Sequence, residues 1–193
     1  MSGPSAEQVL EFVRTERRPM LELLRKLVEA ESPSTRVDSH RQVRALLSTE
    51  LQSLGFHVRN PGSRNAEQHV YARPAQRRKF APRQLLIGHF DTVWPLGTIS
   101  DRPFTVDDNI VKGPGVFDMK GGLAQIIYAV KAVYELSDGP EIEPVIFINA
   151  DEEIGSRSST RLIRLLAQNA SRAFVLEPAM GEEGVLKTER KGI

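Results

Sequence analysis

The stretch LLIGHFDTV, residues 85–93, is the most informative part of the chain, because an apolar run leads directly into a histidine and an aspartate. The run Leu85–Gly88 is short and apolar, as expected for a strand that is buried on both faces of a sheet. His89 and Asp91 follow at once, and their spacing places both side chains on the same side of an extended backbone. An imidazole and a carboxylate at a strand end predict part of a metal site, which needs further ligands from elsewhere in the chain.

Two more short apolar runs are followed by acidic residues in the same way. Pro144–Ala150 leads into the triplet Asp151–Glu153, and Ala173–Leu176 leads into Glu177. By itself the triplet would most often be a solvated loop or an acidic cluster at a helix amino terminus. Glu177 is the least distinctive of these acids when its local sequence is considered alone. Their positions directly after predicted buried strands favour a shared site.

Helices are predicted between these strands, because apolar residues recur at helical spacing in Gly122–Leu136 and again in Ser158–Ala170. Alternating strands and helices give parallel strands whose carboxyl ends meet at one edge, where open α/β sheets bind ligands. We therefore predict an α/β fold, a three-layer sandwich with a mostly parallel mixed sheet flanked by helices. The side chains that should converge at this edge are His89, Glu152, Glu153 and Glu177.

Before the first of these strands, the pattern predicts three helices and a pair of antiparallel strands. Ser5 and Gln8 form a capping-box pattern at the start of the first helix. Pro19 is expected to break or kink this helix before the second one begins. The basic stretch Arg73–Arg83 is interpreted as a solvated hairpin turn. The predicted elements are the helices Val9–Val13, Met20–Ala30 and Val37–Leu54 and the strands Phe56–Val58 and His69–Ala72.

Asp118 lies in the glycine-rich stretch GPGVFDMKGG, residues 113–122. It could simply cap the following helix, but the glycines on both sides indicate a tightly turned backbone that comes close to another group. Their spacing matches neither a P-loop nor a dinucleotide-binding fingerprint, so nucleotide binding is not predicted. The other three histidines are interpreted as structural or exposed, because His40 lies on a polar helix face and His57 and His69 lie in edge segments without partner acids.

Four motifs occur in this order: HFDTV at 89–93, GPG at 113–115, DMKGG at 118–122 and DEEIGS at 151–156. Together they resemble the zinc-dependent exopeptidase and deacylase family that includes carboxypeptidase G, succinyl-diaminopimelate desuccinylase, acetylornithine deacetylase and aminoacylase. The sequences and spacing of the motifs resemble those of the glutamate carboxypeptidases most closely. The resemblance extends from about Leu21 to the end of the chain.

The resemblance implies a centre with two zinc ions that share the carboxylate of Asp118. His89 and Glu177 would complete the protein ligands of one ion. Glu153 would bind the other ion, together with a histidine that the family supplies further along its sequence. Cobalt or manganese is also compatible, because imidazole and oxygen ligands without cysteine suit all three metals.

The resemblance also assigns roles to the residues beside the ligands. Glu152 would be the general base, taking a proton from water and passing it to the leaving nitrogen. Asp91 would stand behind His89 and hold its ring in the tautomer that leaves one nitrogen free for the metal. The peptide bond between Asp118 and Met119 is expected to be cis, which is rare outside proline.

Composition argues against several other classes of function. The net charge is +1 with 26% charged residues, which gives no strong electrostatic case for a nucleic acid or membrane partner. The chain has no cysteine, which rules out disulfides and thiolate ligands. Its first residues lack a hydrophobic signal core, and no apolar run approaches membrane length, so a cytoplasmic location is the default expectation.

Members of the resembled family are about twice as long as this chain of 193 residues. We expect residues 1–193 to be the amino-terminal part of the catalytic domain, with the lid or dimerisation domain and the carboxyl-terminal part of the catalytic domain absent. The fold would then be incomplete after a strand expected over Gly184–Lys191. A homodimer is an expectation only for the longer protein.

The expected activity is metal-dependent hydrolysis of an amide or peptide bond next to a free carboxylate, as in a glutamate carboxypeptidase-like metallopeptidase. The substrate would be a small peptide or an N-acyl amino acid, and the isolated chain is expected to be inactive. Two alternatives stay open. The chain could be an inert metal-binding or subunit-interacting fragment, or its parent could be an N-acyl amino acid deacylase or carbamoyl amidohydrolase of the same fold.

Overall fold

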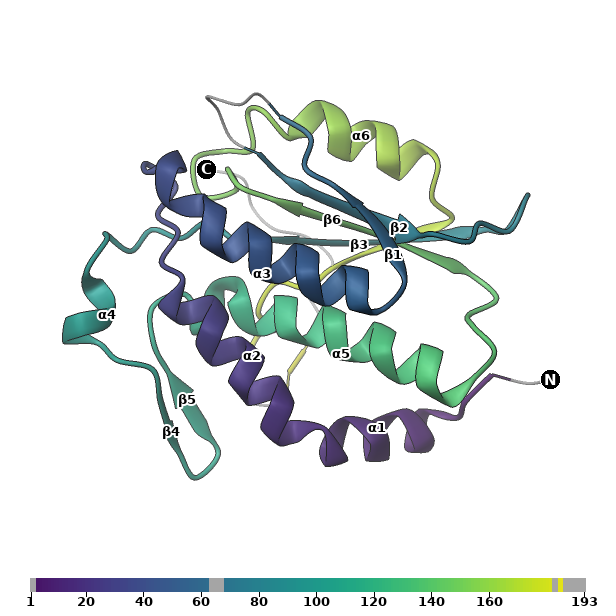
Figure 1. The fold of residues 1–193 in the computed structure, drawn as a ribbon, viewed down its shortest axis with the longest axis horizontal. Coiled ribbons are helices and arrows are strands. Elements are labelled where there is room, and N and C mark those ends of the chain that lie inside the picture. The colour runs from purple at the N-terminus through teal and green to yellow at the C-terminus, as the bar shows by residue number, and fades with distance from the viewer. Residues whose placement is uncertain (1–2, 63–67, 182–183, 186–193) are drawn as a thin grey trace.

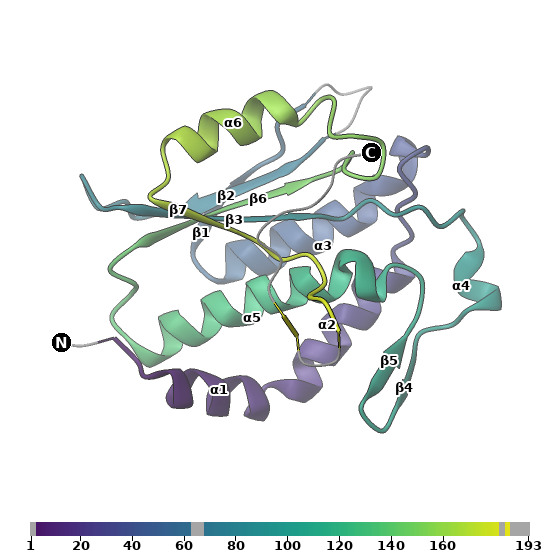
Figure 2. The ribbon, with the colours of Figure 1, turned by 180° about the vertical axis from the view of Figure 1, so that it is seen from behind.

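The computed structural model describes residues 3–62, 68–181 and 184–185, which form a mixed sheet between two layers of helices (Figures 1 and 2). The sheet has five strands in the order β1-β2-β6-β3-β7. The predicted α/β three-layer sandwich is therefore confirmed. The strands of the sheet are β1 (Phe56–Arg59), β2 (Val70–Pro74), β3 (Arg83–His89), β6 (Glu143–Asn149) and β7 (Arg172–Val175).

Four helices lie on one side of the sheet, three of them against its face and the amino-terminal one packed on the outside of the others, and α6 (Thr160–Gln168) covers the other face (Figures 1 and 2). The small helix α4 and a two-stranded hairpin project from one side (Figure 1). The helices of the first face are α1 (Ala6–Thr15), α2 (Arg17–Glu29), α3 (His40–Ser53) and α5 (Gly121–Leu136). The remaining elements are α4 (Thr98–Asp101), the hairpin strands β4 (Thr105–Asp107) and β5 (Ile110–Lys112), and two short helical turns, Val37–Ser39 and Val116–Lys120.

Strand β3 pairs in parallel with both β6 and β7, as the sequence predicts. His89 is in register with Asn149 on one side, and Ile87 is in register with Val175 on the other. The carboxyl ends of all three strands therefore lie at the same edge of the sheet. The three acidic segments that follow these strands begin close to one another.

The antiparallel part of the sheet differs from the prediction in one respect. Strands β1 and β2 pair as expected, but β2 then pairs with β6 and not with β3. Because β6 lies between β2 and β3, Arg73–Arg83 is not a hairpin turn, and that interpretation is wrong. The predicted strand Gly184–Lys191 lies almost entirely outside the described residues.

The first helices differ slightly from their predicted bounds. The capping box of Ser5 and Gln8 is present at α1. The break between the first two helices falls at Glu16, and Pro19 lies in the first turn of α2. A proline is tolerated there, because the first amide groups of a helix have no partner within the helix.

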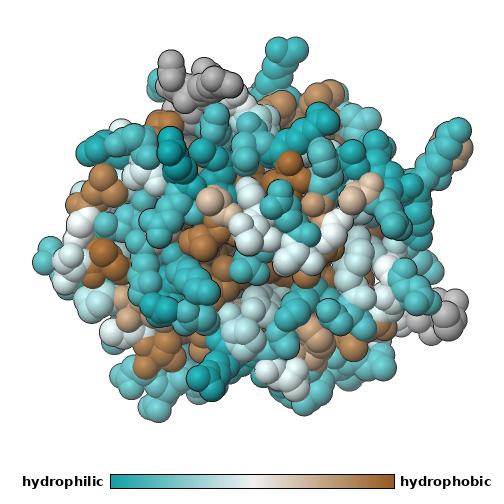
Figure 3. Space-filling model, in the orientation of Figure 1, coloured by the Kyte–Doolittle hydropathy of each residue, from teal (hydrophilic) through white to brown (hydrophobic). Residues whose placement is uncertain are grey.

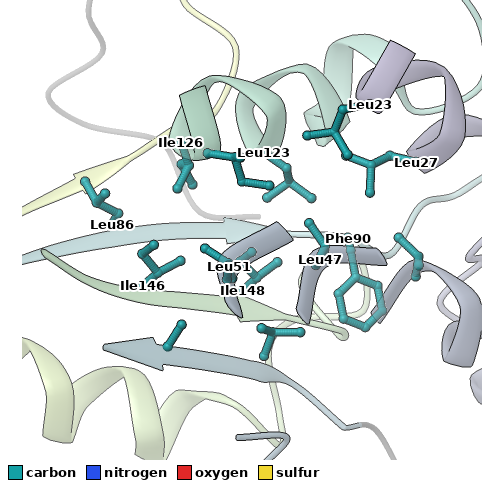
Figure 4. Packing of buried hydrophobic residues seen from close by; sticks show 14 of the residues in the cluster. Leu23, Leu27, Leu47, Leu51, Leu86, Phe90, Leu123, Ile126, Ile146 and Ile148 are labelled. Carbon is teal, nitrogen blue, oxygen red and sulfur yellow. The ribbon is translucent and has the colours of Figure 1, made fainter. Parts of the chain in front are cut away.

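The main hydrophobic core lies between the sheet and helices α2, α3 and α5. Leu123 and Ile126 of α5 point toward Leu86 of β3 and toward Ile146 and Ile148 of β6 (Figure 4). A second cluster packs α6 on the opposite face of the sheet. The central strands are thus buried between two layers, as their continuous apolar runs predict. The residues of this second cluster include Leu85, Val145, Phe147, Leu162, Ile163 and Leu166.

The face seen in Figure 3 carries apolar side chains in small groups among hydrophilic ones. No helix in the described part of the chain is long and apolar enough to cross a membrane.

Candidate metal centre

His89 ends β3 and is buried, with 1% of its surface exposed. The residue before it is packed closely, because a Cβ at Gly88 would lie 2.7 Å from the end of the Leu123 side chain and 2.9 Å from that of Met119, and both ends would have to shift. The Nδ1 atom of His89 lies 2.9 Å from the backbone oxygen of Asp91. A carbonyl oxygen only accepts hydrogen bonds, so Nδ1 carries a proton. Nε2 faces Asp118 and is the nitrogen that could bind a metal once the ion displaces its proton.

The carboxylate of Asp91 contacts the acidic loop after β6 more closely than it contacts the imidazole. Its Oδ1 lies 3.5 Å from Nδ1 of His89. Oδ1 accepts the backbone N–H of Glu152 at 3.2 Å, and Oδ2 accepts that of Glu153 at 3.2 Å and the hydroxyl of Ser34 at 2.7 Å. Asp91 therefore ties His89 and both glutamates into one unit. The sequence indicated the first of these links but not the second.

Three carboxylates face the Nε2 atom of His89. The nearest oxygens of Asp118, Glu177 and Glu152 lie 3.0, 3.5 and 3.9 Å from it. Two groups of ligand-type atoms, each with members within 4.8 Å of one another, could hold a metal ion. One group is His89, Glu152 and Glu177, and the other is His89, Asp118 and Glu153. The structure thus brings together all the predicted ligands and the predicted base.

Asp118 reaches this position from the helical turn Val116–Lys120, which leads into α5. Its backbone leaves helical geometry, and its peptide bond to Met119 is cis, as predicted. Lys120 anchors the turn from behind. Its buried amine donates to the backbone oxygens of Leu27 and Ala30 at 2.7 and 3.1 Å, at the carboxyl end of α2. Burial lowers the pKa of this lysine to about 7.

The crowding of acids shifts the pKa values of two members of the cluster. Burial disfavours the charged form of His89, but hydrogen bonds with Asp118, Asp91 and Glu177 outweigh it and raise the pKa to about 12. Burial also raises the pKa of Glu153 to about 7, and the charge of Asp118 adds to the effect. The cluster therefore holds protons tightly in the absence of a compensating cation.

The donor set fits a divalent metal ion. It combines one imidazole nitrogen with carboxylate oxygens, which zinc, cobalt and manganese all accept. The raised pKa values of His89 and Glu153 give a second, electrostatic reason, since a cation would replace the protons that now relieve the repulsion between the acids. Neither argument selects one metal over another.

Two histidines that the sequence placed elsewhere are buried. His40 is fully buried at the start of α3, with Nε2 2.9 Å from the Pro33 oxygen and its ring edge-on to Phe90. Its predicted position on a polar helix face is wrong. His69 lies beside Ser158, which in turn contacts Asp151. No local pattern could indicate this link, because the pairing of β2 with β6 is what brings the two segments together.

Comparison with known proteins agrees with this geometry. The protein-family model described as "Peptidase family M20/M25/M40" matches residues 85–193 of this chain. Carboxypeptidase G2 from Pseudomonas sp. is 29% identical over 188 residues, which cover 97% of this chain and 45% of that protein. Acetylornithine deacetylase from Salmonella arizonae is 33% identical over 172 residues, which cover 83% of this chain and 43% of that protein.

Solved structures show the same fold. Human carnosine dipeptidase 1 superposes with a TM-score of 0.75 at 19% identity, covering 90% of this chain and 42% of that one. At this level of identity the likeness concerns the fold alone. The chain spans less than half the length of the curated relatives that it matches.

Proposed function

The chain belongs to peptidase family M20/M25/M40, and from this premise we propose that it forms the amino-terminal part of a metal-dependent hydrolase acting on an amide or peptide bond next to a free carboxylate. One observation carries the proposal. Acidic side chains from the loops after β6 and β7 and from the helical turn before α5 gather around Nε2 of His89 at the end of β3. This is the arrangement that a hydrolytic metal centre needs. The lid or dimerisation domain and the rest of the catalytic domain would lie outside this chain.

His89, Asp118 and Glu177 would hold one ion, since both acids lie within 3.5 Å of the same imidazole nitrogen. Asp118 would also share its carboxylate with a second ion held by Glu153. The metal, zinc by preference, would supply a Lewis acid and lower the pKa of water from 15.7 to about 7. The protein's own contribution is to fix these oxygens and to direct Nε2 of His89 at them, since Nδ1 is engaged with the backbone oxygen of Asp91.

Glu152 would be the general base. Its Oε2 lies 3.9 Å from Nε2 of His89, and its backbone is held by Asp91, so its carboxylate is placed at the edge of the centre. From there it can take a proton from water and return it to the leaving nitrogen. The two glutamates have similar positions, since each belongs to one of the ligand groups around His89. The choice of Glu152 as base and Glu153 as ligand therefore needs its own test.

The relatives' names indicate the range of substrates. They include a carboxypeptidase, a succinyl-diaminopimelate desuccinylase and an acetylornithine deacetylase. We favour a glutamate carboxypeptidase-like activity on small peptides, with N-acyl amino acid deacylation as the second candidate and carbamoyl hydrolysis as the third. A cytoplasmic location and a homodimer of the longer protein stay predictions from the sequence. The length matched, less than half of each relative, favours an inactive isolated chain.

The test expresses the gene together with the codons that follow Ile193 and assays the product with zinc. C-terminal glutamate dipeptides, N-acetyl and N-succinyl amino acids and a carbamoyl amino acid serve as substrates. Glu152→Gln should lower turnover by about 10²–10⁴-fold, the usual contribution of general acid–base catalysis, and leave the zinc content unchanged. Glu153→Gln should lower the zinc content.

Two results would count against the proposal. If Glu152→Gln lost zinc and Glu153→Gln kept it, the roles of the two glutamates would be exchanged. If no member of the panel were hydrolysed by a zinc-loaded product, the proposed activity would be wrong, and the inert metal-binding alternative would remain.

A further inference from the structure

A buried hydrogen-bond network lies beneath the loop that carries Glu152 and Glu153. This loop, residues 151–159, joins β6 to α6, and its first residue, Asp151, is 1% exposed. Oδ2 of Asp151 accepts from the backbone N–H and the hydroxyl of Ser158, at 2.7 and 2.8 Å, and from the N–H of Ser159 at 3.2 Å. The end of the loop is therefore bonded back to its beginning.

His69 joins this network to strand β2, which pairs with β6 on the side opposite β3. It precedes β2 directly, is 1% exposed and packs against Phe147 of β6. Its Nδ1 lies 3.2 Å from the backbone nitrogen of Ala150, and its Nε2 lies 3.2 Å from Oγ of Ser158. His69 thus contacts the loop both before and after the two glutamates.

The direction of these hydrogen bonds follows from their donors. The N–H of Ala150 can only donate, so Nδ1 of His69 accepts, and the proton of the neutral ring lies on Nε2. Nε2 then donates to Ser158, whose own hydroxyl proton goes to Asp151. The result is a one-way chain from His69 through Ser158 to Asp151.

This direction argues against a second catalytic site. A serine nucleophile needs a histidine nitrogen free to take its proton, with the acid on the other nitrogen of the ring. Here the nitrogen that faces Ser158 carries a proton, and the acid binds the serine instead of the histidine. The three residues therefore hold a loop in place and do not form a nucleophilic triad.

We propose that His69 is a positioning residue that, through Ser158 and Asp151, fixes the loop presenting Glu152 and Glu153 to the metal centre. The meaning of that position rests on the proposed function. Strand β6 lies between β2 and β3, so the loop after it is held from both neighbours. His69 holds it from the β2 side, and Asp91 holds it from the β3 side by accepting the N–H groups of both glutamates.

The first test uses the metal-free chain and amide hydrogen exchange measured by NMR. Ser158→Ala removes the hydroxyl link from an exposed position, so the fold should survive. The amides of Glu152 and Glu153 should exchange about 3- to 10-fold faster, the factor that corresponds to the loss of one hydrogen bond. Ser53→Ala is the control, because it also removes an exposed hydroxyl that donates one hydrogen bond, in this case to the backbone oxygen of Glu50 at the end of α3.

The second test changes the histidine. His69→Leu fills the position with an apolar side chain and removes the hydrogen bonds with Ala150 and Ser158, so it should accelerate the same two amides at least as much as Ser158→Ala. His69→Gln can still present an N–H near the position of Nε2, and it should restore slow exchange. In the unchanged protein, nitrogen chemical shifts of the imidazole should show the proton of His69 on Nε2.

Equal exchange at Glu152 and Glu153 in Ser158→Ala and Ser53→Ala would overturn the proposal, as would a proton on Nδ1 of His69. Zinc titration of the same variants separates this inference from the proposed function. Faster exchange with weaker zinc binding supports both. Faster exchange with unchanged zinc binding supports the positioning role of His69 and counts against Glu153 as a ligand.

Discussion

Strands β6 and β7 are both parallel neighbours of β3, and both are short apolar runs followed by an acid, yet their surroundings differ. All seven residues of β6 are buried, whereas all four residues of β7 are exposed. Strand β6 lies between β2 and β3 and is covered by helices on both faces (Figures 1 and 2). Within the described residues, β7 pairs only with β3. The same sequence pattern therefore predicts a strand but not what covers it.

The difference extends to the metal centre. The glutamates after β6 sit in a loop that Asp91 and the His69 network hold on two sides. Glu177 follows β7 after one residue, Leu176, whose N–H donates to Ile87 of β3. One half of the site is thus built on the buried centre of the sheet and the other on its exposed edge. We expect the two halves to respond differently to substitution.

The largest expected effect compares one phenylalanine in each strand. Phe147→Ala in β6 removes a side chain that is 1% exposed and should lower the free energy of unfolding by about 3–5 kcal/mol. Phe174→Ala in β7 removes one that is 48% exposed and should cost less than about 1 kcal/mol. Urea denaturation with a common m-value measures both. Similar losses would show that β7 is as well packed as β6.

A substitution at Gly122 tests how the part of the metal centre that contains Glu177 is held in place. A Cβ at Gly122 would collide with the backbone oxygen of Leu176 and lie 3.0 Å from the Met119 side chain. Gly122→Ala should cost about 1–3 kcal/mol of stability, as overpacking usually does. It should also weaken zinc binding, because it displaces the residue before Glu177. Gly3→Ala is the control, since a Cβ there meets nothing within 4 Å.

The Gly122→Ala variant also separates the two halves of the site. Amide exchange at Glu152 and Glu153 should stay as in the unchanged chain, because the hydrogen bonds by which His69 and Asp91 hold the loop do not involve Gly122. Faster exchange at both glutamates would mean that the site responds as one unit and that the comparison fails.

The smallest expected effect is a pH dependence carried by the loop after β6. Burial, with the charge of Asp118, raises the pKa of Glu153 from 4.5 to about 7 in the folded chain. A carboxyl group whose pKa is higher in the folded chain than in the unfolded chain stabilises the fold fully at pH values below its unfolded pKa. This stabilisation is lost as the pH rises through its folded pKa. The metal-free chain should therefore lose stability between about pH 4.5 and 7. Thermal melts across this range should show a smaller loss in Glu153→Gln, and an unchanged loss would contradict the assignment.

Local pattern was enough to predict the centre of the sheet and the convergence of its acids. The apolar runs before His89, Glu152 and Glu177 each became a parallel strand, because burial on two faces leaves a continuous hydrophobic signature. The cis bond at Asp118 followed from the resemblance and not from the residues themselves.

Features that depend on contacts between distant segments were missed. The pairing of β2 with β6, the role of His69 and the capping of α2 by Lys120 all join parts of the chain that are far apart in sequence. Periodicity carries no information about such partners. Ser158 and Ser34 have ordinary local sequence, and only the fold brings their hydroxyls to Asp151 and Asp91.

We have proposed that the ends of β3, β6 and β7 and the turn before α5 form one metal centre. The direct measurement is anomalous scattering at the zinc absorption edge from crystals of the chain grown with zinc. We expect a zinc peak about 2.0–2.1 Å from Nε2 of His89, with oxygens of Asp118 and Glu177 among its ligands. A peak only at other sites, or a His89 ring with no zinc beside it at saturating metal, would mean that these residues do not form a metal centre.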